Sequence, residues 1–576
     1  MQVGFLALEV GTVRAKNVKA ALFKSMIDHS IVAICWFCIG FSIFSGSNMF
    51  ASGPDTYWFF HPDSDFARLF QQYAFAVTTV MIVSGAVISR IRLWIYLFFS
   101  GMLTIYIYPV VAHWAWNPYG WLYVMGFKDF SGSSVVHVVG GFSALVGAMA
   151  CGPRVGRFGD PGEGGSENSR MERRGSEDGS EASFGHFHPE EPHDICRHRL
   201  VKRLCCNSTF CRKIVDILSL HSPVPFRVRE QLGHSTQLQC LGALLIYVSS
   251  FSFNTSSSLG LDTVDKAYSA ARAAVNTMLS AAAGSICALL WSTFFRKSYD
   301  VNLIVNGLLS SLVVINSGCG YIDNWAAIVV GLISVPVYVY FSRVVLYIFH
   351  IDDPLDSFAV HGACGIIGTI WTGFTDSEAG LFHTGDASLL GVQILGSFAI
   401  AGWTLVNAFI QFYGLKYILL PCFSRCCHRK NNDVADEYED DFGYSIVYST
   451  DAQLVGLDFF YFGGSGFPDF DVEAVSEYNA TQRIKQRFKA KRMGSMNMFD
   501  RDVSELSTHM KHVSTVNNHV TPTSVFGHLR ENVSNNRRLS EQNMTGMGNK
   551  RTSEQVMVVD SFIVSNPQRT SKDSDD

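Results

Sequence analysis

The chain has 576 residues, of which 48% are hydrophobic, 13% are aromatic and only 16% are charged. An ordinary soluble domain has about 25% charged residues, so the composition excludes a soluble multidomain enzyme. The 14 cysteines are scattered and lie mostly in apolar stretches, which excludes a disulfide-stapled secreted domain. The formal net charge of −5 is small for this length and gives no support for nucleic-acid binding. The composition indicates a polytopic membrane protein.

Ten apolar stretches approach or exceed the roughly 20 residues that a helix needs to span the hydrocarbon of a bilayer. In chain order they are Ser30–Phe44, Leu69–Ser89, Leu93–Ala112, Ser133–Cys151, Leu238–Phe253, Ala267–Phe295, Leu303–Ile322, Trp325–His350, Phe358–Phe374 and Leu389–Leu420. The stretch Met1–Gly11 precedes them and has about half of the necessary length. It has no basic leader and no cleavage site, so it is a poor signal peptide. We interpret it as the inner half of a first span, and we expect a longer upstream reading frame to encode the outer half.

The loops between these stretches alternate in charge. Basic residues such as Arg90 and Arg296 occupy every second loop, and acidic residues such as Asp262 and Asp323 occupy the others. Basic loops stay in the cytoplasm, so the alternation predicts eleven crossings with the amino end outside and the carboxyl tail in the cytoplasm. The predicted fold is an all-α polytopic bundle of eleven helices, the first of which is truncated in this chain.

This topology divides the chain into five parts. Residues 1–151 hold the first five helices, with helix one partial, and residues 234–420 hold helices six to eleven. Between them, residues 152–233 form a cytoplasmic insert that is rich in Gly, Ser and Glu and therefore largely disordered. Residues 421–493 form a cytoplasmic regulatory segment, and the polar residues 494–576 form a disordered tail.

Two segments of the chain echo each other. Asp129–Gly147 reads DFSGSSVVHVVGGFSALVG, and Asp353–Gly373 reads DPLDSFAVHGACGIIGTIWTG. Each has an Asp eight residues before a His, a Val directly before that His and a Gly four residues after it. The segments belong to the fifth and tenth crossings, and units of five crossings must be inverted relative to each other. An inverted five-plus-five repeat with polar groups at matching places indicates a transport path near the bilayer midplane.

The two histidines of the repeat, His137 and His361, are the most informative residues in the sequence. An ionisable group within a span is energetically costly and usually faces a cavity or a partner. One such histidine alone would be expected to bond a neighbouring helix and pack the bundle. Two at matching positions favour a shared site instead. Neutral imidazoles offer both a donor and an acceptor nitrogen, and they can accept and relay a proton near neutral pH.

Aspartates precede both of these spans. Asp129 and Asp356 are each expected to cap the following helix, with the carboxylate accepting its first free amide N–H groups. Asp129 lies on the outer side in this topology, where its charge would also favour arriving cations. Asp356 lies on the inner side, where a structural role is expected.

Several motifs in chain order resemble those of the ammonium transporters. The chain is identified as a member of this family (the Amt/Mep/Rh superfamily), within the Amt branch of plants, algae and bacteria, over about Met1 to Gly464 apart from the insert. The resemblance implies an eleven-helix bundle with a pseudo-twofold repeat, assembled as a homotrimer in the plasma membrane with one pore per subunit. The motifs are GTVRAKN (Gly11–Asn17), QYAFAVTTVMIVSGAVISR (Gln72–Arg90), AHWAW (Ala112–Trp116), DFSGSSVVH (Asp129–His137), FSFN (Phe251–Asn254), INSGCGYI (Ile315–Ile322) and DDPLDSFAVHG (Asp352–Gly362).

Within this resemblance, His137 and His361 match the twin histidines that line the narrow pore. Phe75, in QYAFA, and Phe253, in FSFN, match the two stacked phenylalanines of the outer gate. Without the motif register, these aromatic residues would be expected to be packing or interfacial side chains.

Further residues carry roles by the same resemblance. Trp116 and Ser257 match the aromatic and hydroxyl lining of the outer cation site, and Asp129 matches the aspartate that supports it. Asn316 stands where the family more often has Ser or Thr, and we expect it, together with Asp356, to give structural support. The sequence matches no zinc-site spacing, and neither a metal nor another cofactor is expected.

The function implied is transport of ammonium or methylammonium for nitrogen uptake, without enzymatic activity. A bare cation entering hydrocarbon meets a desolvation cost of tens of kcal/mol, whereas an aromatic cage recovers only about 2 kcal/mol. Ammonium can give up a proton and cross as ammonia, which potassium cannot do. An electroneutral ammonia facilitator and an ammonium sensor with the same fold remain alternatives. A haem-binding redox protein, with the two histidines as axial ligands, is a remote alternative.

Control of the transporter is expected from the cytoplasmic regions. The tail segment Asp451–Gly464 resembles the regulatory helix of the family, but Phe460 stands where plant members carry a phosphorylatable Thr and Phe462 replaces the usual His. Ser176 and Ser540 each follow a pair of arginines, a setting in which phosphate would change the local charge. We regard both serines as candidate phosphorylation sites for a kinase or another cytoplasmic regulator.

Overall fold

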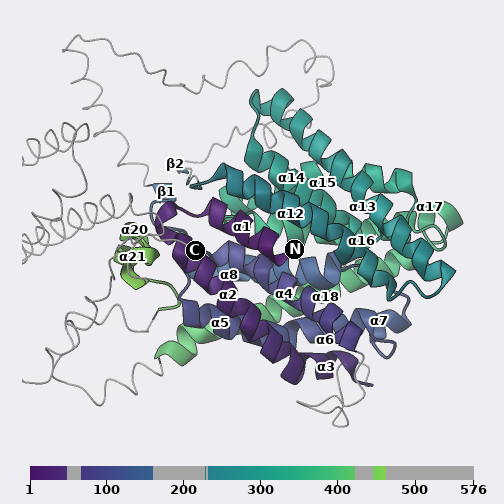
Figure 1. The fold of residues 1–576 in the computed structure, drawn as a ribbon, viewed down its shortest axis with the longest axis horizontal. Coiled ribbons are helices and arrows are strands. Elements are labelled where there is room, and N and C mark those ends of the chain that lie inside the picture. Colours follow the sequence, from purple (N-terminus) through teal and green to yellow (C-terminus); the bar gives the residue numbers. More distant parts are fainter. Residues whose placement is uncertain (48–65, 160–226, 229–230, 232, 422–444, 462–576) are drawn as a thin grey trace, which may run out of the picture. The chain divides into compact units, whose positions relative to one another are not determined.

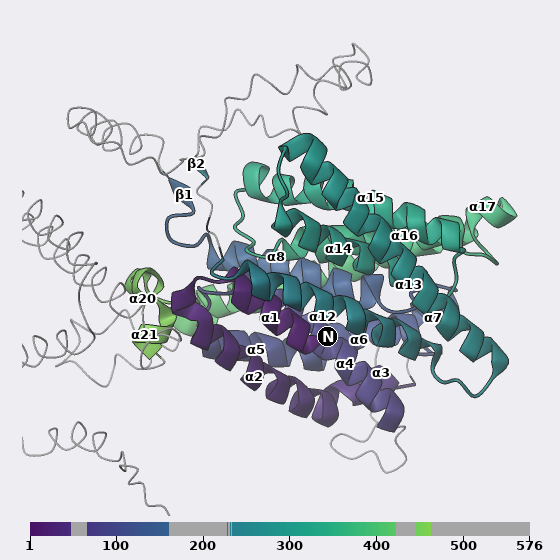
Figure 2. The same cartoon turned by 45° about the horizontal axis from the view of Figure 1, so that its top comes forward.

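The computed structural model describes residues 1–47, 66–159, 227–228, 231, 233–421 and 445–461. All of them belong to one compact unit, Met1–Gln482. The regular structure of the described residues is helical, apart from two isolated β-bridges and one short antiparallel strand pair, in which β1 (Phe158–Gly159) pairs with β2 (Arg227–Val228). Figures 1 and 2 show β1, β2, α20 and α21 at one end of the helices and α7 and α17 at the other. We call these the tail end and the α7 end.

The described helices fall into two sets, one on each side of the gap at residues 160–226. The first set comprises α1 (Gln2–Thr12), η1 (Ala15–Asn17), α2 (Val18–Cys35), η2 (Trp36–Gly40), α3 (Phe41–Ser45), α4 (Phe66–Val87), α5 (Leu93–Met102), η3 (Leu103–Ile107), α6 (Tyr108–Trp116), α7 (Trp121–Val124), η4 (Ser133–Val138) and α8 (Val139–Cys151). The second comprises α12 (Thr236–Thr255), η6 (Ser256–Ser258), α13 (Val264–Trp291), η7 (Ser292–Arg296), α14 (Val301–Ile315), α15 (Asn324–Arg343), η8 (Val344–Ile348), η9 (Phe358–Ala363), α16 (Cys364–Thr375), α17 (Leu381–Thr384), α18 (Ser388–Gly414), η10 (Leu415–Leu419), α20 (Thr450–Val455) and α21 (Leu457–Tyr461).

Nine helices in the described part of the chain are long and apolar enough to cross a membrane. The apolar helix α14 is shorter, with 15 residues, and α1 has 11. These two complete the eleven-helix bundle that the sequence predicts. Helix α1 lies along α12 (Figure 1), and their backbones approach closely at glycines. A Cβ at Gly4 would lie 2.8 Å from the Gly242 oxygen, so a larger residue there would push the two helices apart.

The apolar stretch Leu303–Ile322 is not one continuous helix. Helix α14 ends at Ile315, and the next residues form a turn that pairs with the segment before η4. The carbonyls of Asn316 and Ser317 accept the N–H groups of Ser131 and Phe130, at 2.8 and 3.0 Å. The prediction of a full span here was wrong at its end, because these carbonyls bond another segment instead of continuing the helix.

The histidine-bearing helices of the two repeats cross in close contact, and glycines that follow the histidines lie at the crossing point. A Cβ added at Gly141 would lie 2.2 Å from the Gly362 nitrogen, and one at Gly365 would lie 2.4 Å from the Ser133 oxygen. Each glycine therefore packs on the backbone of the other repeat's helix. This reciprocal contact fits the five-plus-five repeat and brings η4 against η9, the two segments that carry the histidines.

A buried ion pair joins the first two helices. Lys24 Nζ lies 3.6 Å from Glu9 Oε2, donates to the Ser84 carbonyl at 3.1 Å and sits 4.8 Å from the centre of the Tyr96 ring. The Glu9 side chain has no exposed surface, and neither of its oxygens has a hydrogen-bond partner. Lys24 therefore provides the charge that compensates this carboxylate.

We expect Lys24→Met to lower the free energy of unfolding by about 3–5 kcal/mol, because it leaves the Glu9 charge buried without its counter-ion. The double variant Glu9→Gln/Lys24→Met should recover most of this loss. Thermal unfolding of the detergent-solubilised proteins measures both changes. Equal melting temperatures for the single variant and the wild type would contradict the prediction.

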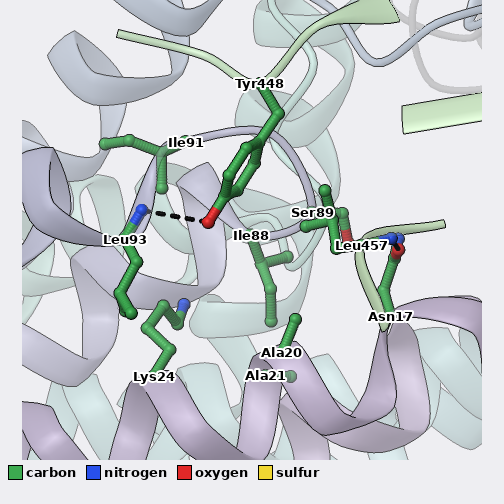
Figure 3. Close-up of a pocket in the computed structure, with 10 residues that line it drawn as sticks. All are labelled: Asn17, Ala20, Ala21, Lys24, Ile88, Ser89, Ile91, Leu93, Tyr448 and Leu457. Atoms are coloured by element: carbon green, nitrogen blue, oxygen red, sulfur yellow. Dashed lines mark hydrogen bonds between the residues drawn. The ribbon is translucent and has the colours of Figure 1, made fainter. Parts of the chain in front are cut away.

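The tail segment 445–461 docks against the start of α2 and the loop between α4 and α5. The Asp458 carboxylate accepts the Lys19 and Ala20 N–H groups at 2.9 and 2.8 Å, which caps α2. The Leu457 N–H bonds Asn17 Oδ1, and the Leu93 N–H bonds the Tyr448 hydroxyl. Figure 3 shows the small pocket beneath this segment, with Tyr448 on one side and Lys24 and Asn17 on the other.

Asp458→Ala should loosen this docking, because the cap on α2 is lost, at a cost of about 1 kcal/mol. Hydrogen–deuterium exchange of a peptide covering residues 17–24 should then be faster by about fivefold. Glu378→Ala, at an exposed carboxylate 86% accessible, serves as the control. Unchanged exchange in Asp458→Ala would show that the tail does not hold α2.

Candidate functional site

The two repeat histidines meet inside the bundle. His137 lies in η4 and His361 in η9, and their Nδ1 atoms are 3.0 Å apart. The rings are nearly parallel, with 10° between their planes and 5.1 Å between their centres. The residues are only 4% and 6% exposed. The structure thus brings together the pair that the sequence singled out.

The hydrogen bond between the two rings restricts which ring nitrogens can carry a proton. A hydrogen bond needs one donor and one acceptor, so one Nδ1 atom carries a proton and the other does not. The remaining ring nitrogen of His137, Nε2, lies 2.7 Å from Asn316 Nδ2. Three polar side chains therefore form a short chain of hydrogen bonds in the order Asn316, His137, His361.

A small cavity on the side of His361 is lined mostly by apolar residues. The Phe5 ring lies 6.1 Å from the imidazole of His361. Phe5 and its neighbour Leu8 were not among the predicted site residues, and the apolar pattern of α1 was their only signal. The cavity is lined by Phe5, Leu8, Met81, Ile82, Gly85, Leu309, Leu355, Ser357, Val360 and His361.

Three aromatic residues cluster where α4, α6 and α12 approach each other. Phe75 and Phe253 pack edge to face, with 4.3 Å between ring centres. Trp116 lies 5.3 Å from Phe75. The structure thus brings these three predicted residues into contact, near the α7 end, because α6 ends at Trp116 just before α7.

Asp129 connects this aromatic cluster to η4. Its carbonyl oxygen accepts the indole N–H of Trp116 at 2.6 Å. Burial raises the pKa of its carboxyl group to about 6, against the opposing effect of the backbone N–H groups that it accepts. The expected cap is present: the carboxylate accepts the N–H groups of Gly132, Ser133, Ser134 and Val135, at 2.8 to 3.2 Å.

Ser257 lies beside this segment, in η6. Its hydroxyl accepts the Ser131 hydroxyl at 3.0 Å, two residues after Asp129. It therefore bridges the second half of the chain to the first, directly after the helix that carries Phe253.

Asp356 does not cap the helix of the second repeat, contrary to the prediction. Its backbone has a positive φ of 54°, which is uncommon for a residue other than glycine. Its carboxylate accepts Ser342 Oγ at 2.8 Å and the Tyr338 hydroxyl at 3.0 Å. Asp353 instead accepts the Phe358 N–H at 2.9 Å. The cap belongs to Asp353 because Asp353, like Asp129, stands eight residues before the histidine.

The buried carboxylate of Asp352 ties segments of the bundle together at the tail end. Asp352 lies 2.8 Å from Arg154 Nε and 3.2 Å from Arg90 Nη1. Burial would raise the pKa of Asp352, but hydrogen bonding to Arg154 and the charges of Arg154 and Arg90 outweigh it and hold the pKa at about 2. Arg157 Nε lies 3.4 Å from the same carboxylate. Asp352 is therefore ionised, and it links the segment before η9 to the segment that follows α8.

Ser176, Ser540 and Phe462 lie outside the described residues. Among the residues that are described, no group of three or more His, Cys, Asp or Glu side chains has an arrangement that could hold a metal ion.

Two variants of Asp129 should distinguish the contribution of its charge to stability from the contribution of its cap. Asp129→Ala leaves four N–H groups without their acceptor and should lower the free energy of unfolding by about 2 kcal/mol or more. In Asp129→Asn an acceptor remains but the titration is lost. An exposed aspartate has a pKa of about 3.9, so native Asp129 holds its proton more tightly than the unfolded chain does. The wild type should therefore gain stability relative to Asp129→Asn as the pH falls from 7 to 4.

Thermal unfolding of the wild type and both variants at several pH values measures these changes. A constant difference between wild type and Asp129→Asn from pH 7 to pH 4 would contradict the raised pKa.

Most of the chain matches a known protein family. Residues 1–172 and 224–432 match the Ammonium Transporter Family. Ammonium transporter 3 of Dictyostelium discoideum is 31% identical, over 72% of this chain and 85% of its own length. Ammonium transporter 1 member 2 of Arabidopsis thaliana is 30% identical, over 70% of this chain and 73% of its own.

Solved structures show the same fold. A structure titled Sensor Amt Protein aligns with a TM-score of 0.57 and 24% identity, over 72% of this chain and 89% of its own. Mep2 of Candida albicans aligns with a TM-score of 0.55 and 20% identity, over 76% of this chain and 84% of its own.

Proposed function

Because this chain belongs to the ammonium transporter family, we propose that it moves ammonium nitrogen across a membrane as ammonia, past His137 and His361. The observation that carries the proposal is the hydrogen bond between these imidazoles, 3.0 Å long and contributed by the two inverted repeats. Beside it lies a small, mostly apolar cavity that His361 helps to line. A polar pair within an apolar passage suits a small neutral molecule that can donate and accept hydrogen bonds.

Capture begins at the α7 end in this proposal. The cation would be attracted by the aromatic ring of Trp116, which lies 5.3 Å from the buried ring of Phe75. Such contacts are worth about 2 kcal/mol, far less than the desolvation cost of carrying a charge through the apolar interior. The cation must therefore lose its proton before it passes Phe253. One N–H bond of NH₄⁺ breaks and its proton passes to the imidazole pair, while NH₃ continues through the bore.

The imidazole pair has two tasks in this mechanism. It supplies hydrogen bonds that replace those lost when ammonia leaves water, and it offers a route for the released proton. Potassium has no proton to lose and meets the full desolvation cost. Selectivity then comes from the acidity of the guest rather than from its size.

The remaining features of the proposal concern the whole assembly. The protein would be a homotrimer in the plasma membrane, with the α7 end outside and the tail end in the cytoplasm, and would take up ammonium or methylammonium without acting as an enzyme. The basic residues Arg90 and Arg154 lie at the tail end, which supports this orientation. The docked tail segment offers a surface for a cytoplasmic regulator or kinase.

Sensing is a second candidate function, since one structural neighbour is titled a sensor. An electroneutral ammonia facilitator is the third. Ammonium-dependent inward current in voltage-clamped cells would support an electrogenic transporter, uptake without current would support the facilitator, and binding with neither would support the sensor. Haem ligation is disfavoured, because the Nδ1 atoms of His137 and His361 bond each other directly and leave no room for iron between them.

The test of the proposed function is uptake of methylammonium in cells that lack their own ammonium transport. The wild type should restore uptake, and His137→Ala or His361→Ala should lower it at least about tenfold, through loss of a hydrogen bond in the bore. His383→Gln, at a partly exposed histidine near Asp323, is the matched control and should behave as the wild type. Full uptake in both alanine variants would contradict the proposal.

A further inference from the structure

Asn316 stands directly after the end of α14 and points at the histidine pair. Its Nδ2 atom is 2.7 Å from His137 Nε2, which makes this contact shorter than the one between the two rings. The residue is 3% exposed, and its Oδ1 atom is buried without a hydrogen-bond partner. An unpaired buried carbonyl costs roughly 1–3 kcal/mol, so this orphaned acceptor requires an explanation.

The backbone fixes the position of this side chain. The Asn316 carbonyl accepts the Ser131 N–H at 2.8 Å, and its own N–H bonds the Val313 carbonyl. The Cys319 thiol also donates to the Asn316 carbonyl. The amide is thus held against His137 by the turn that ends α14.

The amide dictates which nitrogen of His137 carries the proton. An amide NH₂ group only donates, so His137 Nε2 must be the acceptor and must be unprotonated. The single proton of a neutral His137 ring then sits on Nδ1, where it is donated to His361 Nδ1. His361 in turn must carry its own proton on Nε2. The Asn316 amide therefore fixes the direction of both hydrogen bonds in the series from Asn316 through His137 to His361.

We propose that Asn316 is a positioning residue of the ammonia path, which sets the tautomer of His137 through Nδ2 and offers Oδ1 as a hydrogen-bond acceptor to the passing ammonia. This inference rests on the proposed function and extends it to Asn316, for which the sequence analysis named a structural role. Ammonia has three N–H groups and seeks acceptors, and Oδ1 is an acceptor that nothing in the described structure uses.

The amide also affects how a proton leaves His137. For Nε2 to become protonated, the amide must turn so that Oδ1 faces it, because two donors cannot face each other. A hydroxyl in this place can donate or accept after a simple rotation. Asn316 should therefore slow the reversal of the donor chain more than the Ser or Thr that the family more often has there.

Three variants separate these roles. Asn316→Leu keeps the volume but removes both polar ends, and Asn316→Thr supplies a hydroxyl. Asn316→Asp keeps the shape and, at a pH where its carboxylate is ionised, can only accept from His137. The initial rate of methylammonium uptake into proteoliposomes gives a maximal rate and a KM for each.

We expect Asn316→Leu to lower the maximal rate by about tenfold, as the loss of one hydrogen bond in the bore implies, and to change KM by less than about twofold. Capture occurs at the aromatic cluster, which the variant does not touch. Asn316→Thr should stay within about threefold of the wild type. An unchanged maximal rate in Asn316→Leu, or an equal loss in Asn316→Thr, would overturn the proposal.

The tautomer has its own readout, which does not require transport. Nitrogen-15 chemical shifts of histidine-labelled protein in liposomes distinguish protonated from unprotonated ring nitrogens, and a His137→Gln sample identifies the signals of His137. We expect the wild type to carry the proton on Nδ1 and Asn316→Asp to carry it on Nε2. The same tautomer in both would overturn the positioning role.

The two readouts keep the possible failures apart. If the wild type transports nothing, the proposed function fails while the tautomer experiment still decides on Asn316. If Asn316→Leu does not fold, as judged by its melting temperature, the comparison of wild type, Asn316→Asp and Asn316→Thr supplies the same test.

Discussion

The hydrogen bond between His137 and His361 is the interaction on which the remainder of the site depends. It exists because two helices from inverted repeats cross in contact, with Gly141 of one repeat against Gly362 of the other. A Cβ at Gly141 would lie 2.2 Å from backbone, so a side chain there would separate the crossing helices. The repeat thus supplies two matched imidazoles at a distance that neither half of the chain could provide alone.

Charged side chains flank this hydrogen bond at the two ends of the bundle, whereas the cavity beside it is mostly apolar. His361 helps to line this cavity, and the carboxylates of Asp129 and Asp352 stand outside the flanking spans, at the α7 end and the tail end. Both carboxylates are buried and fully engaged, one by backbone N–H groups and the other by arginines. Fixed charge therefore holds the ends of the bundle in place, while the proposed path between them carries groups that can be neutral. Such a division favours a guest that can itself become neutral.

Periodic and repeated features were predictable from the sequence, and features set by tertiary contacts were not. Apolar length predicted the spans, and the repeated Asp, Val, His and Gly spacing predicted that His137 and His361 belong together. The end of α14 at Ile315 was missed, because Ser131 and Phe130 compete for the carbonyls that follow it. The cap at Asp353 was assigned to Asp356, although the repeat register indicates Asp353, which stands eight residues before its histidine, as Asp129 does. The contact between the Asn316 amide and His137 Nε2 could not be predicted from the sequence, because it depends on how the end of α14 packs against η4.

The account holds that nitrogen crosses only after its cation has lost a proton, so comparing ammonium with potassium in one preparation tests it most directly. Purified protein in proteoliposomes can be given equal inward gradients of either ion, with protein-free vesicles measuring the background leak. The account predicts protein-dependent flux of the nitrogen species and a potassium flux no greater than that leak. Potassium entering as fast as ammonium would contradict it, because a path that carries a permanent cation cannot depend on deprotonation.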